Sequence, residues 1–236
     1  MCNTLNAICQ RRAVKIFEPV AISGEQRAQL LDAARLAPSS FNIQPYRLYW
    51  VNSSAMRETV ARLCLNQSPA RTASALVIAV ADIGCWQETA QGQMDWMRNS
   101  GFDPAEIAAY ERRAKYVKWF FIQGWFDILG AMKWSILRIL NLWRIIGMPP
   151  VSHQGLFKWS TKSAALACEN LMIAAEAMGL NTCPMEGFDG RRLSKLLRLS
   201  TRYQEVVMVI AIGKRCSGSA EKPQWRRPLE ATVTFL

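Results

Sequence analysis

The sequence predicts a mixed protein of helices and strands, in which a central sheet is covered by helices on both faces. Two runs, residues 75–81 and 206–212, are continuously apolar and rich in alanine, valine and isoleucine. Strands that are buried on both faces have this composition, because helices shield each side of the sheet. Segments with helical periodicity precede both runs, and others lie between them, so they supply the expected covering layers.

The length of 236 residues predicts one domain, and half of the residues are hydrophobic, which is enough for a sizeable core. Lys and Arg outnumber Asp and Glu by 29 to 18, so the formal net charge is +11. This balance favours an anionic partner: a phosphorylated cofactor, an acidic lipid surface or nucleic acid. The basic residues are dispersed rather than gathered in one tract, so we expect no nucleic-acid partner.

Cysteine and histidine usage excludes several classes of protein. The seven cysteines are an odd number without a CxxC pair, so we expect reduced, buried thiols in a cytoplasmic protein. The start of the sequence lacks the pattern of a signal peptide. His153 is the only histidine, which excludes a multi-histidine zinc site, and we expect no metal. Because it follows Pro149 and Pro150, we expect it in a loop.

The first long helical pattern ends at a polar turn, residues 38–46. Ser23 and Gln26 form a capping box at the start of this helix, and Pro38 ends it, because proline disfavours helix at the preceding residue. The turn carries short hydroxyl and amide side chains and leads into a strand at residues 47–51. Such a turn can hold a ligand or merely link a helix to a strand, and the residues alone allow both.

Residues 85–155 are the unusual part of the sequence. A helix is expected to start at Asp103 and Pro104, and residues 120–146 form a long helical pattern without proline. Four charges argue against a helix that spans a bilayer. Two hypotheses remain: a core or dimer-interface helix that acts as a lid, or an interfacial helix on an anionic membrane. The wide apolar face of this pattern holds Trp125, Phe126, Ile128, Leu129, Ile136, Leu137, Leu140 and Trp143.

Caps and terminators define the other expected elements. We expect a central, buried helix that starts at Ser160 or Thr161 and stops before Gly179. A short extended piece follows at residues 181–188. The remaining expected elements are a helix at 54–65 capped by Ser53 or Ser54, a basic helix capped by Asp189, and a last strand at 231–235.

Three cations stand close together near the start of the chain, at Arg11, Arg12 and Lys15. Guanidinium groups match phosphate oxygens in geometry, so one hypothesis is a phosphate clamp. The alternative is a solvated basic turn, because basic residues are abundant throughout the chain.

Taken together, ordered segments of the chain resemble the FMN-dependent nitroreductase family. The resemblance is carried by residues 11–17 (RRAVKIF), 34–46 (ARLAPSSFNIQPY), 170–172 (NLM), 184–189 (PMEGFD) and 226–229 (RRPL). It implies a single nitroreductase-like domain over residues 1–236 with an α+β fold, a three-layer sandwich whose central mixed sheet is flanked by helices. Residues 85–155 form a long helical insertion in it. The family also implies a homodimer with FMN at the interface.

The resemblance assigns residues to cofactor binding by position. The cations near the start and one from the tail would hold the phosphate, and the polar turn would line the flavin from the partner subunit. The backbone of Glu186 and Gly187 would lie near flavin N5, and no side chain is assigned a catalytic role. The cofactor positions are Arg11, Arg12, Ala13, Lys15, Pro38, Ser39, Ser40, Asn42, Asn66, Pro184, Met185, Glu186, Gly187 and Arg226.

Several positions depart from the family pattern. Ala13 stands where serine is common, which removes one hydroxyl from the phosphate site. Gln224 and Pro69 replace frequent lysines, and Tyr46 replaces tryptophan. These changes weaken individual contacts without removing the site.

The resemblance implies an FMN-containing, NAD(P)H-dependent oxidoreductase. Hydride would pass from NADH or NADPH to the flavin, and then to a nitroaromatic, a quinone or a similar small-molecule acceptor, by a ping-pong mechanism. Such chemistry needs no side-chain nucleophile or metal cluster, which agrees with the residues present. The alternative is a flavin-binding protein with little turnover, whose basic amphipathic helix at residues 120–146 docks to a membrane surface or a partner.

Overall fold

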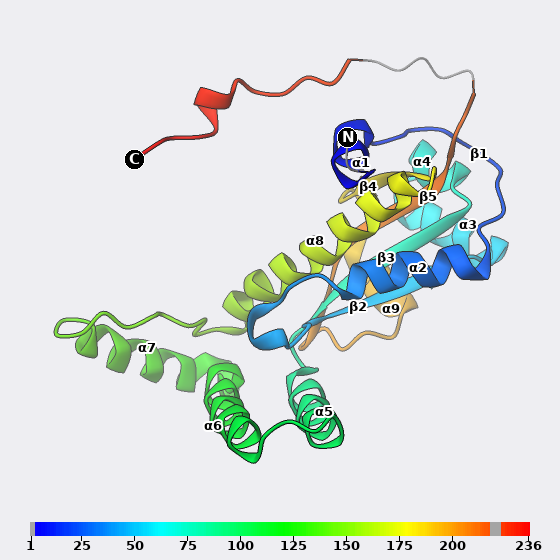
Figure 1. The fold of residues 1–236 in the computed structure, drawn as a ribbon. Helices are drawn as coiled ribbons and strands as arrows, with labels where there is room; N and C mark the ends of the chain where they lie inside the picture. Colours follow the sequence, from blue (N-terminus) through cyan, green and yellow to red (C-terminus); the bar gives the residue numbers. More distant parts are fainter. Residues whose placement is uncertain (1–2, 218–222) are drawn as a thin grey trace.

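The computed structural model describes residues 3–217 and 223–236. Within these residues a five-stranded sheet lies at the centre (Figure 1). The strand order is β1-β5-β3-β2, and β4 also pairs with β5. The strands are β1 (Phe17–Glu18), β2 (Tyr46–Val51), β3 (Ala75–Asp82), β4 (Asn181–Met185) and β5 (Gln204–Arg215).

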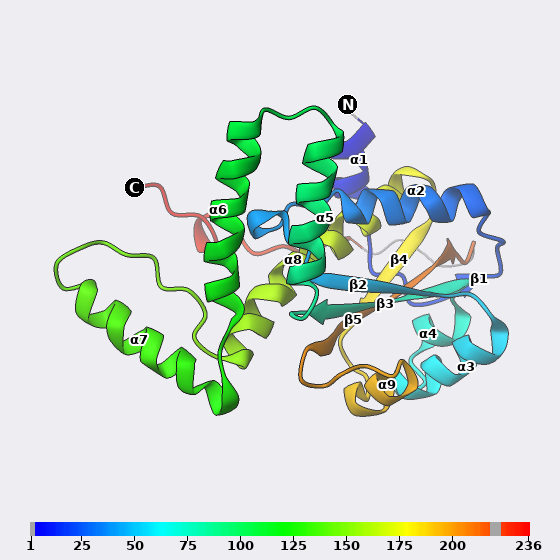
Figure 2. The ribbon, with the colours of Figure 1, turned by 90° about the horizontal axis from the view of Figure 1, so that it is seen from below.

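Helices cover both faces of the sheet and extend beyond one end of it (Figures 1 and 2). Their bounds are α1 (Asn3–Gln10), α2 (Gly24–Arg35), α3 (Ser54–Leu63), α4 (Ser68–Thr72), α5 (Trp86–Asn99), α6 (Pro104–Phe121), α7 (Ile128–Leu140), α8 (His153–Ala177) and α9 (Gly190–Leu196). Short 3-10 helices are η1 (Ser40–Asn42), η2 (Trp125–Asp127) and η3 (Leu229–Ala231).

The core consists of two apolar layers, one on each face of the sheet. Leu30 of α2 and Leu171 of α8 pack with Val77 of β3 on one face. Val60 of α3 and Leu193 of α9 pack on the other face. Figure 2 shows α2 and α8 on one side of the strands and α3, α4 and α9 on the opposite side. The expected α+β three-layer sandwich is therefore confirmed.

Strand β3 is buried along its whole length, as expected of a strand covered on both faces. All ladders in the sheet are antiparallel, so the expectation of a mixed sheet needs a correction. The only parallel pair among the described residues is an isolated bridge between Ala13 and Thr182. The chain leaves β2 and enters β3 at the same end of the sheet, which makes these neighbours antiparallel.

The local capping signals are confirmed. Ser23 and Gln26 form the capping box of α2, and Ser53 caps α3. Asp103 caps α6, and Asp189 caps α9. Gly179 has φ +73°, which is the left-handed conformation that ends a helix and that glycine adopts without steric cost. Hydrogen bonds between residues close in sequence determine these helix ends, so they can be predicted from the sequence alone.

The expectation of one helix over residues 120–146 is wrong, because the chain breaks between α6 and α7. Gly124, Phe126 and Asp127 have φ values of +77°, +50° and +59°, which interrupt the helical path. The buried amide of Gln123 donates to the carbonyls of Phe120 (2.9 Å) and Pro150 (3.1 Å). A long-range contact with residue 150 therefore stabilises the break. The side chain of Trp125 lies outside the described part.

Two further expectations about this half of the chain are corrected. Helix α8 starts at His153 rather than near Ser160, and the Ser152 hydroxyl caps it by accepting from Gly155 N at 3.0 Å. Ser160 is buried within the helix, where its hydroxyl donates to the Pro45 carbonyl. His153 is therefore not a loop residue, and its Nδ1 lies 2.6 Å from Asp127 Oδ1.

The expected last strand at residues 231–235 does not form. Among its described residues, the tail after β5 holds one short element, η3, whose side chains are exposed. Figure 1 shows it running away from the sheet, so it has no neighbouring strand edge to pair with.

The cysteines follow expectation only in part. Cys64, Cys168 and Cys183 are buried free thiols, whereas Cys9 is exposed, and Cys2 lies outside the described residues. Among the described helices, none combines the length and the apolar character needed to cross a membrane.

Candidate functional site

The cations near the start of the chain lie along β4. Val14 N donates to the Thr182 carbonyl at 3.0 Å, and Ala13 forms the isolated bridge to the same residue. Lys15 Nζ approaches Cys183 Sγ at 3.5 Å. Pairing with β4 therefore places Arg11, Arg12 and Lys15 at one end of the sheet.

Several buried polar atoms in this region have no hydrogen-bond partner within the described residues. They are Nε of Arg11, Nε of Arg12 and Oγ1 of Thr182. Arg11 Nε is 3.4 Å from Glu169 Oε1 in an ion pair, but without hydrogen-bond geometry. Buried donors in proteins are normally satisfied. The cations and unsatisfied polar atoms at this end of the sheet are of the type that binds an anionic group with several acceptor oxygens, such as a phosphate.

The C-terminal tail reaches this region through a different residue from the one expected. Gln224 Nε2 donates to the Arg11 carbonyl at 3.4 Å. Arg226 is exposed and donates to the carbonyl of Trp225, at 2.9 Å. The structure therefore brings Gln224, rather than Arg226, into contact with the cations near the start.

The end of β4 supplies backbone groups rather than side chains. Pro184 and Met185 pair with β5, and the Met185 side chain is only 4% exposed, so it belongs to the core. Glu186 and Gly187 follow in an exposed turn. Within the described part of the chain, no hydrogen bond from their N–H groups is found. These two donors are free to face a ligand.

A glutamine that the sequence did not reveal as a site residue holds this turn in place. Gln67 Nε2 donates to the Gly187 carbonyl at 2.7 Å. A Cβ at position 187 would lie 3.2 Å from that nitrogen, so the close approach favours glycine there. The two residues are 120 positions apart, and no local spacing could have joined them. The only hint in the sequence was that Gln67, an amide residue, directly follows Asn66, which was already a candidate site residue.

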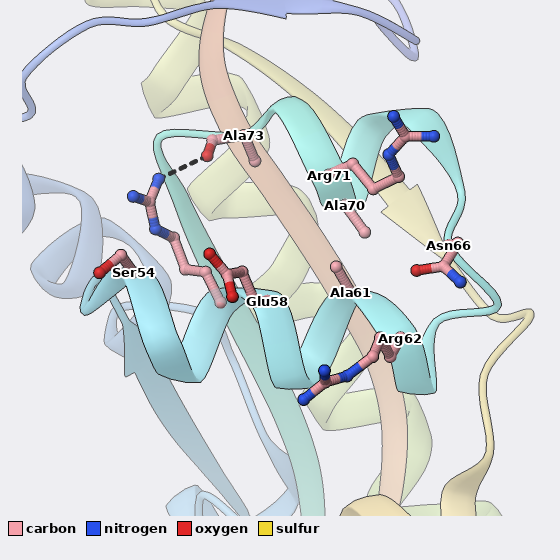
Figure 3. Close-up of a pocket in the computed structure, with 9 residues that line it drawn as sticks. Ser54, Glu58, Ala61, Arg62, Asn66, Ala70, Arg71 and Ala73 are labelled. Carbon is pink, nitrogen blue, oxygen red and sulfur yellow. Dashed lines mark hydrogen bonds between the residues drawn. The ribbon is translucent and has the colours of Figure 1, made fainter.

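Asn66 lies in the connection between α3 and α4 with φ +53°. It borders a hollow of about 410 Å³ that contains three arginines, Arg57, Arg62 and Arg71 (Figure 3). Arg57 Nη1 donates to the carbonyls of Ala73 and Ser74, at 2.7 and 2.8 Å. In Figure 3 the side chains of Arg62 and Arg71 point away from each other. Asn66 is the only expected cofactor residue that lines this hollow, so the hollow is not the site where the expected residues come together.

The polar turn lies at the other end of the sheet, and its own hydrogen bonds shape it. The hydroxyl of Ser39 accepts from Gln44 N at 2.9 Å, and the Ser39 carbonyl accepts from Asn42 N at 2.9 Å. Phe41, Asn42 and Gln44 have φ values of +56°, +53° and +50°. Non-glycine residues rarely adopt this conformation, and such strain clusters at functional sites. Pro38, Ser40 and Asn42 are exposed on this turn.

The turn forms one wall of a small pocket against α5 and α6. The amide of Gln93 on α5 donates to the Asn42 carbonyl and ties the turn to that helix. Burial raises the pKa of the Tyr110 phenol, so this hydroxyl stays neutral and can donate a hydrogen bond. The pocket measures about 230 Å³ and is lined by Phe41, Asn42, Ile43, Ala90, Gln93, Tyr110, Arg113, Ala114 and Val117.

The two groups of candidate residues are well separated within one chain. Thr182, beside the cations, pairs with Ile212, which in turn pairs with Ala75 at the start of β3. Tyr46, after the turn, pairs with Ala81 near the end of β3. Six residues of strand separate these points, or about 20 Å. One chain therefore presents two partial sites at opposite ends of its sheet.

The sequence pattern of the nitroreductase family matches residues 8–214. The chain belongs to this family. The match covers the cations beside β4, the polar turn and the end of β4, so both partial sites lie within the family region. The resemblance in the sequence is thereby confirmed.

Related proteins support the same assignment. Protein DrgA of Synechocystis is 30% identical over 227 residues, which cover 96% of this chain and 90% of that protein. An oxygen-insensitive NADPH nitroreductase of Helicobacter acinonychis is 24% identical, with 96% and 93% covered. Among solved structures, a nitroreductase homologue of Exiguobacterium sibiricum in complex with FMN has a TM-score of 0.74 at 23% identity, with 98% and 96% covered. The last likeness shows the shared fold.

Proposed function

We propose that this nitroreductase-family chain is an FMN-containing oxidoreductase that uses NADH or NADPH as electron donor. The unsatisfied polar atoms of Arg11, Arg12 and Thr182 are the observation that carries the proposal, because buried donors are normally satisfied and a dianionic phosphate would supply acceptors at this end of the sheet. The relative from Helicobacter acinonychis is named as an NADPH enzyme, and the homologue from Exiguobacterium sibiricum was solved with FMN.

The residues of this chain would bind and orient the cofactor. FMN, when bound, supplies the hydride transfer. Arg11, Arg12 and Lys15 would hold its phosphate by charge-assisted hydrogen bonds. The free N–H groups of Glu186 and Gly187 would stabilise negative charge that develops on the ring. Gln67 would keep these N–H groups in position through its bond to Gly187.

We propose a nitroaromatic, quinone or similar flat molecule as electron acceptor, reduced in a ping-pong sequence. Phe41 and Tyr110 offer aromatic surface in the small pocket, and Arg113 offers a cation for a nitro or carbonyl oxygen. Donor and acceptor would occupy this space in turn, as a ping-pong sequence requires.

We propose a cytoplasmic homodimer in which each flavin site combines the two partial sites from different chains. About 20 Å of strand separates them within one chain, so a second copy is needed to bring the polar turn to the cations. The exposed tail supports this arrangement, since Phe235 is 88% exposed and the described part of its own chain does not cover it. The buried free thiols agree with a reducing compartment.

The visible absorption spectrum of the purified protein tests the function. We expect a flavin spectrum that bleaches under anaerobic NADPH or NADH and returns when a quinone is added. Arg11→Ala should lower FMN occupancy, whereas Arg62→Ala, which lies outside the phosphate region, should not. If neither NADH nor NADPH reduced the bound flavin, the result would favour the alternative of a flavin-binding protein with little turnover. Full occupancy in Arg11→Ala would overturn the phosphate assignment.

Mixed dimers test the shared site directly. Arg11→Ala damages one partial site, and Ser40→Trp blocks the other on the exposed turn. Each variant alone should lose flavin. In an equal mixture of chains, half of the dimers are mixed and each restores one intact site, so about one quarter of all sites should recover. No recovery would show that each site is built from a single chain.

A further inference from the structure

Helix α7 turns its aliphatic side to solvent and a polar side to the protein. Ile128, Met132, Ile136 and Ile139 are between 54% and 58% exposed. Their spacing of four, four and three residues places them in one stripe along the helix. The buried positions are Gly130, Lys133 and Leu137, on the opposite side. This is the reverse of the usual arrangement, in which lysine is exposed and isoleucine is buried.

Specific contacts hold α7 in this orientation. Lys133 Nζ donates to the carbonyls of Trp119 (2.8 Å) and Ile122, which the break after α6 leaves without helical partners. Gly130 packs so closely that an added Cβ would lie 1.8 Å from the Val151 carbonyl oxygen. Rolling the helix to bury its aliphatic stripe would remove both contacts.

The apolar surface continues beyond the helix. We use the name α7 arm for residues 128–148. Leu142, Trp143 and Ile145 are 76%, 74% and 104% exposed, and the arm extends away from the sheet (Figures 1 and 2). Water-soluble monomers rarely expose contiguous apolar surface of this kind, so we infer that another phase or molecule covers it.

The charges of the arm narrow the choice of occupant. It contains Lys133, Arg138 and Arg144 but no Asp or Glu. The Arg138 guanidinium lies over the ring of Trp134, 5.6 Å from its centroid. Tryptophan and arginine at the margins of an aliphatic stripe are typical of helices at the boundary between lipid headgroups and acyl chains. In a contact between the arms of two copies, the exposed Arg138 and Arg144 would find no acidic partner on the other arm.

We propose that the α7 arm lies in the surface of an anionic lipid membrane and anchors the protein there as a peripheral enzyme. The 13 residues of α7 span about 20 Å, which is too short to cross a hydrocarbon core of about 30 Å. The aliphatic stripe enters the boundary between headgroups and acyl chains. Arg138 and Arg144 lie at the level of the lipid phosphates, and the sheet stays in water. This inference does not depend on the proposed cofactor.

Co-sedimentation of the full-length protein with vesicles tests this proposal. We expect binding to vesicles of phosphatidylcholine with 30% phosphatidylglycerol, weaker binding in 0.5 M NaCl, and the least binding to pure phosphatidylcholine. Equal binding to both lipid compositions would overturn the anionic preference. Absence of binding to anionic vesicles in low salt would overturn the proposal as a whole.

A double variant of the arm and a control variant elsewhere test whether the α7 arm makes the membrane contact. Ile136→Asp together with Ile139→Asp should lower the vesicle partition coefficient at least about tenfold, because each aliphatic side chain buried in lipid contributes roughly that much. Both positions are exposed, so folding is unaffected. Met56→Asp, on exposed surface of α3, is the matched control and should bind as wild type.

Light scattering after size-exclusion chromatography distinguishes lipid from a second copy. If the arm docks on lipid, the double Ile variant keeps the wild-type molecular mass. A lower mass in the variant, with no vesicle binding by the wild type, would show instead that the arm is an interface between copies.

Discussion

At the scale of single residues, Asp82 connects the sheet to the polar turn. Its side chain is 2% exposed and accepts from Arg47 Nε, from Gly84 N at 2.9 Å and from Gln204 Nε2 at 2.8 Å. Its own N–H donates to the Pro45 carbonyl at 2.9 Å. The turn therefore has a fixed end, which allows the left-handed residues before it to persist.

Asp82→Ala should reduce the free energy of unfolding by about 3 kcal/mol, because it leaves buried donors without an acceptor. Urea denaturation would measure the change. Asp32→Ala is the matched control: its ion pair with Arg35 is exposed on both sides, and its loss should cost less than about 1 kcal/mol. Equal effects of the two variants would contradict this role for Asp82.

The buried thiols predict a loss of stability in alkali. Burial raises the pKa of Cys168 to about 12 and that of Cys64 to about 11. In the unfolded chain these thiols ionise near their ordinary pKa of about 8.5, so above that pH the unfolded state binds fewer protons than the folded state. The free energy of unfolding should therefore fall between pH 9 and 11, by about 1.4 kcal/mol per pH unit for each thiol.

Urea denaturation at several pH values would measure this slope. In Cys168→Ala the decline should be shallower than in wild type, whereas Cys9→Ala, which removes an exposed thiol, should leave it unchanged. Identical slopes in all three proteins would contradict the assignment.

At the scale of elements, the connection between α6 and α7 decides how the insertion is arranged. Hydrogen bonds from Gln123 and Lys133 satisfy the carbonyls at the end of α6. The carboxylate of Asp127 meets His153 at the start of α8, which ties the break to the body of the protein. These contacts place α7 outward as an arm rather than as a continuation of α6.

Two glycine substitutions should have opposite effects. Gly130→Ala places a Cβ against the Val151 carbonyl and should open the arm at a cost of about 2 kcal/mol. Gly92 in α5 has nothing within 4 Å of an added Cβ, so Gly92→Ala should stabilise the helix by about 0.5–1 kcal/mol. Limited trypsin digestion would show cleavage at Lys133, Arg138 or Arg144 accelerated about tenfold or more in Gly130→Ala alone. Unchanged cleavage there would contradict the packing described.

At the scale of the whole molecule, the C-terminal tail and the two partial sites point to a second copy of the chain. Phe235→Asp should weaken the proposed dimer and lower flavin occupancy with it, because the tail would lose an apolar contact on the partner. Thr234→Asp, at the neighbouring exposed position, is the control. Molecular mass against protein concentration would measure the effect, and an unchanged dimer in Phe235→Asp would exclude a role for this side chain.

Much of the fold could be predicted because its determinants are local. Ser23, Ser53, Asp103 and Asp189 cap helices through hydrogen bonds to residues two or three positions away. The apolar composition of β3 alone indicated burial on both faces. The ordered family motifs identified the cations and the polar turn as candidate site residues.

The sequence by itself thus determined the starts of α2, α3, α6 and α9, the buried strands and the family to which the chain belongs. Helix α8 begins after a local cap, Ser152, in place of the expected Ser160 or Thr161. Only the tertiary structure decided that the arm breaks away after α6 and that the tail forms no strand. It also decided that Gln67 holds Gly187 and that Gln224 contacts Arg11. The physical reason is the same in each case. These features depend on hydrogen-bond partners, or on the lack of a strand edge, far along the chain, and no local pattern of residues encodes such distant contacts.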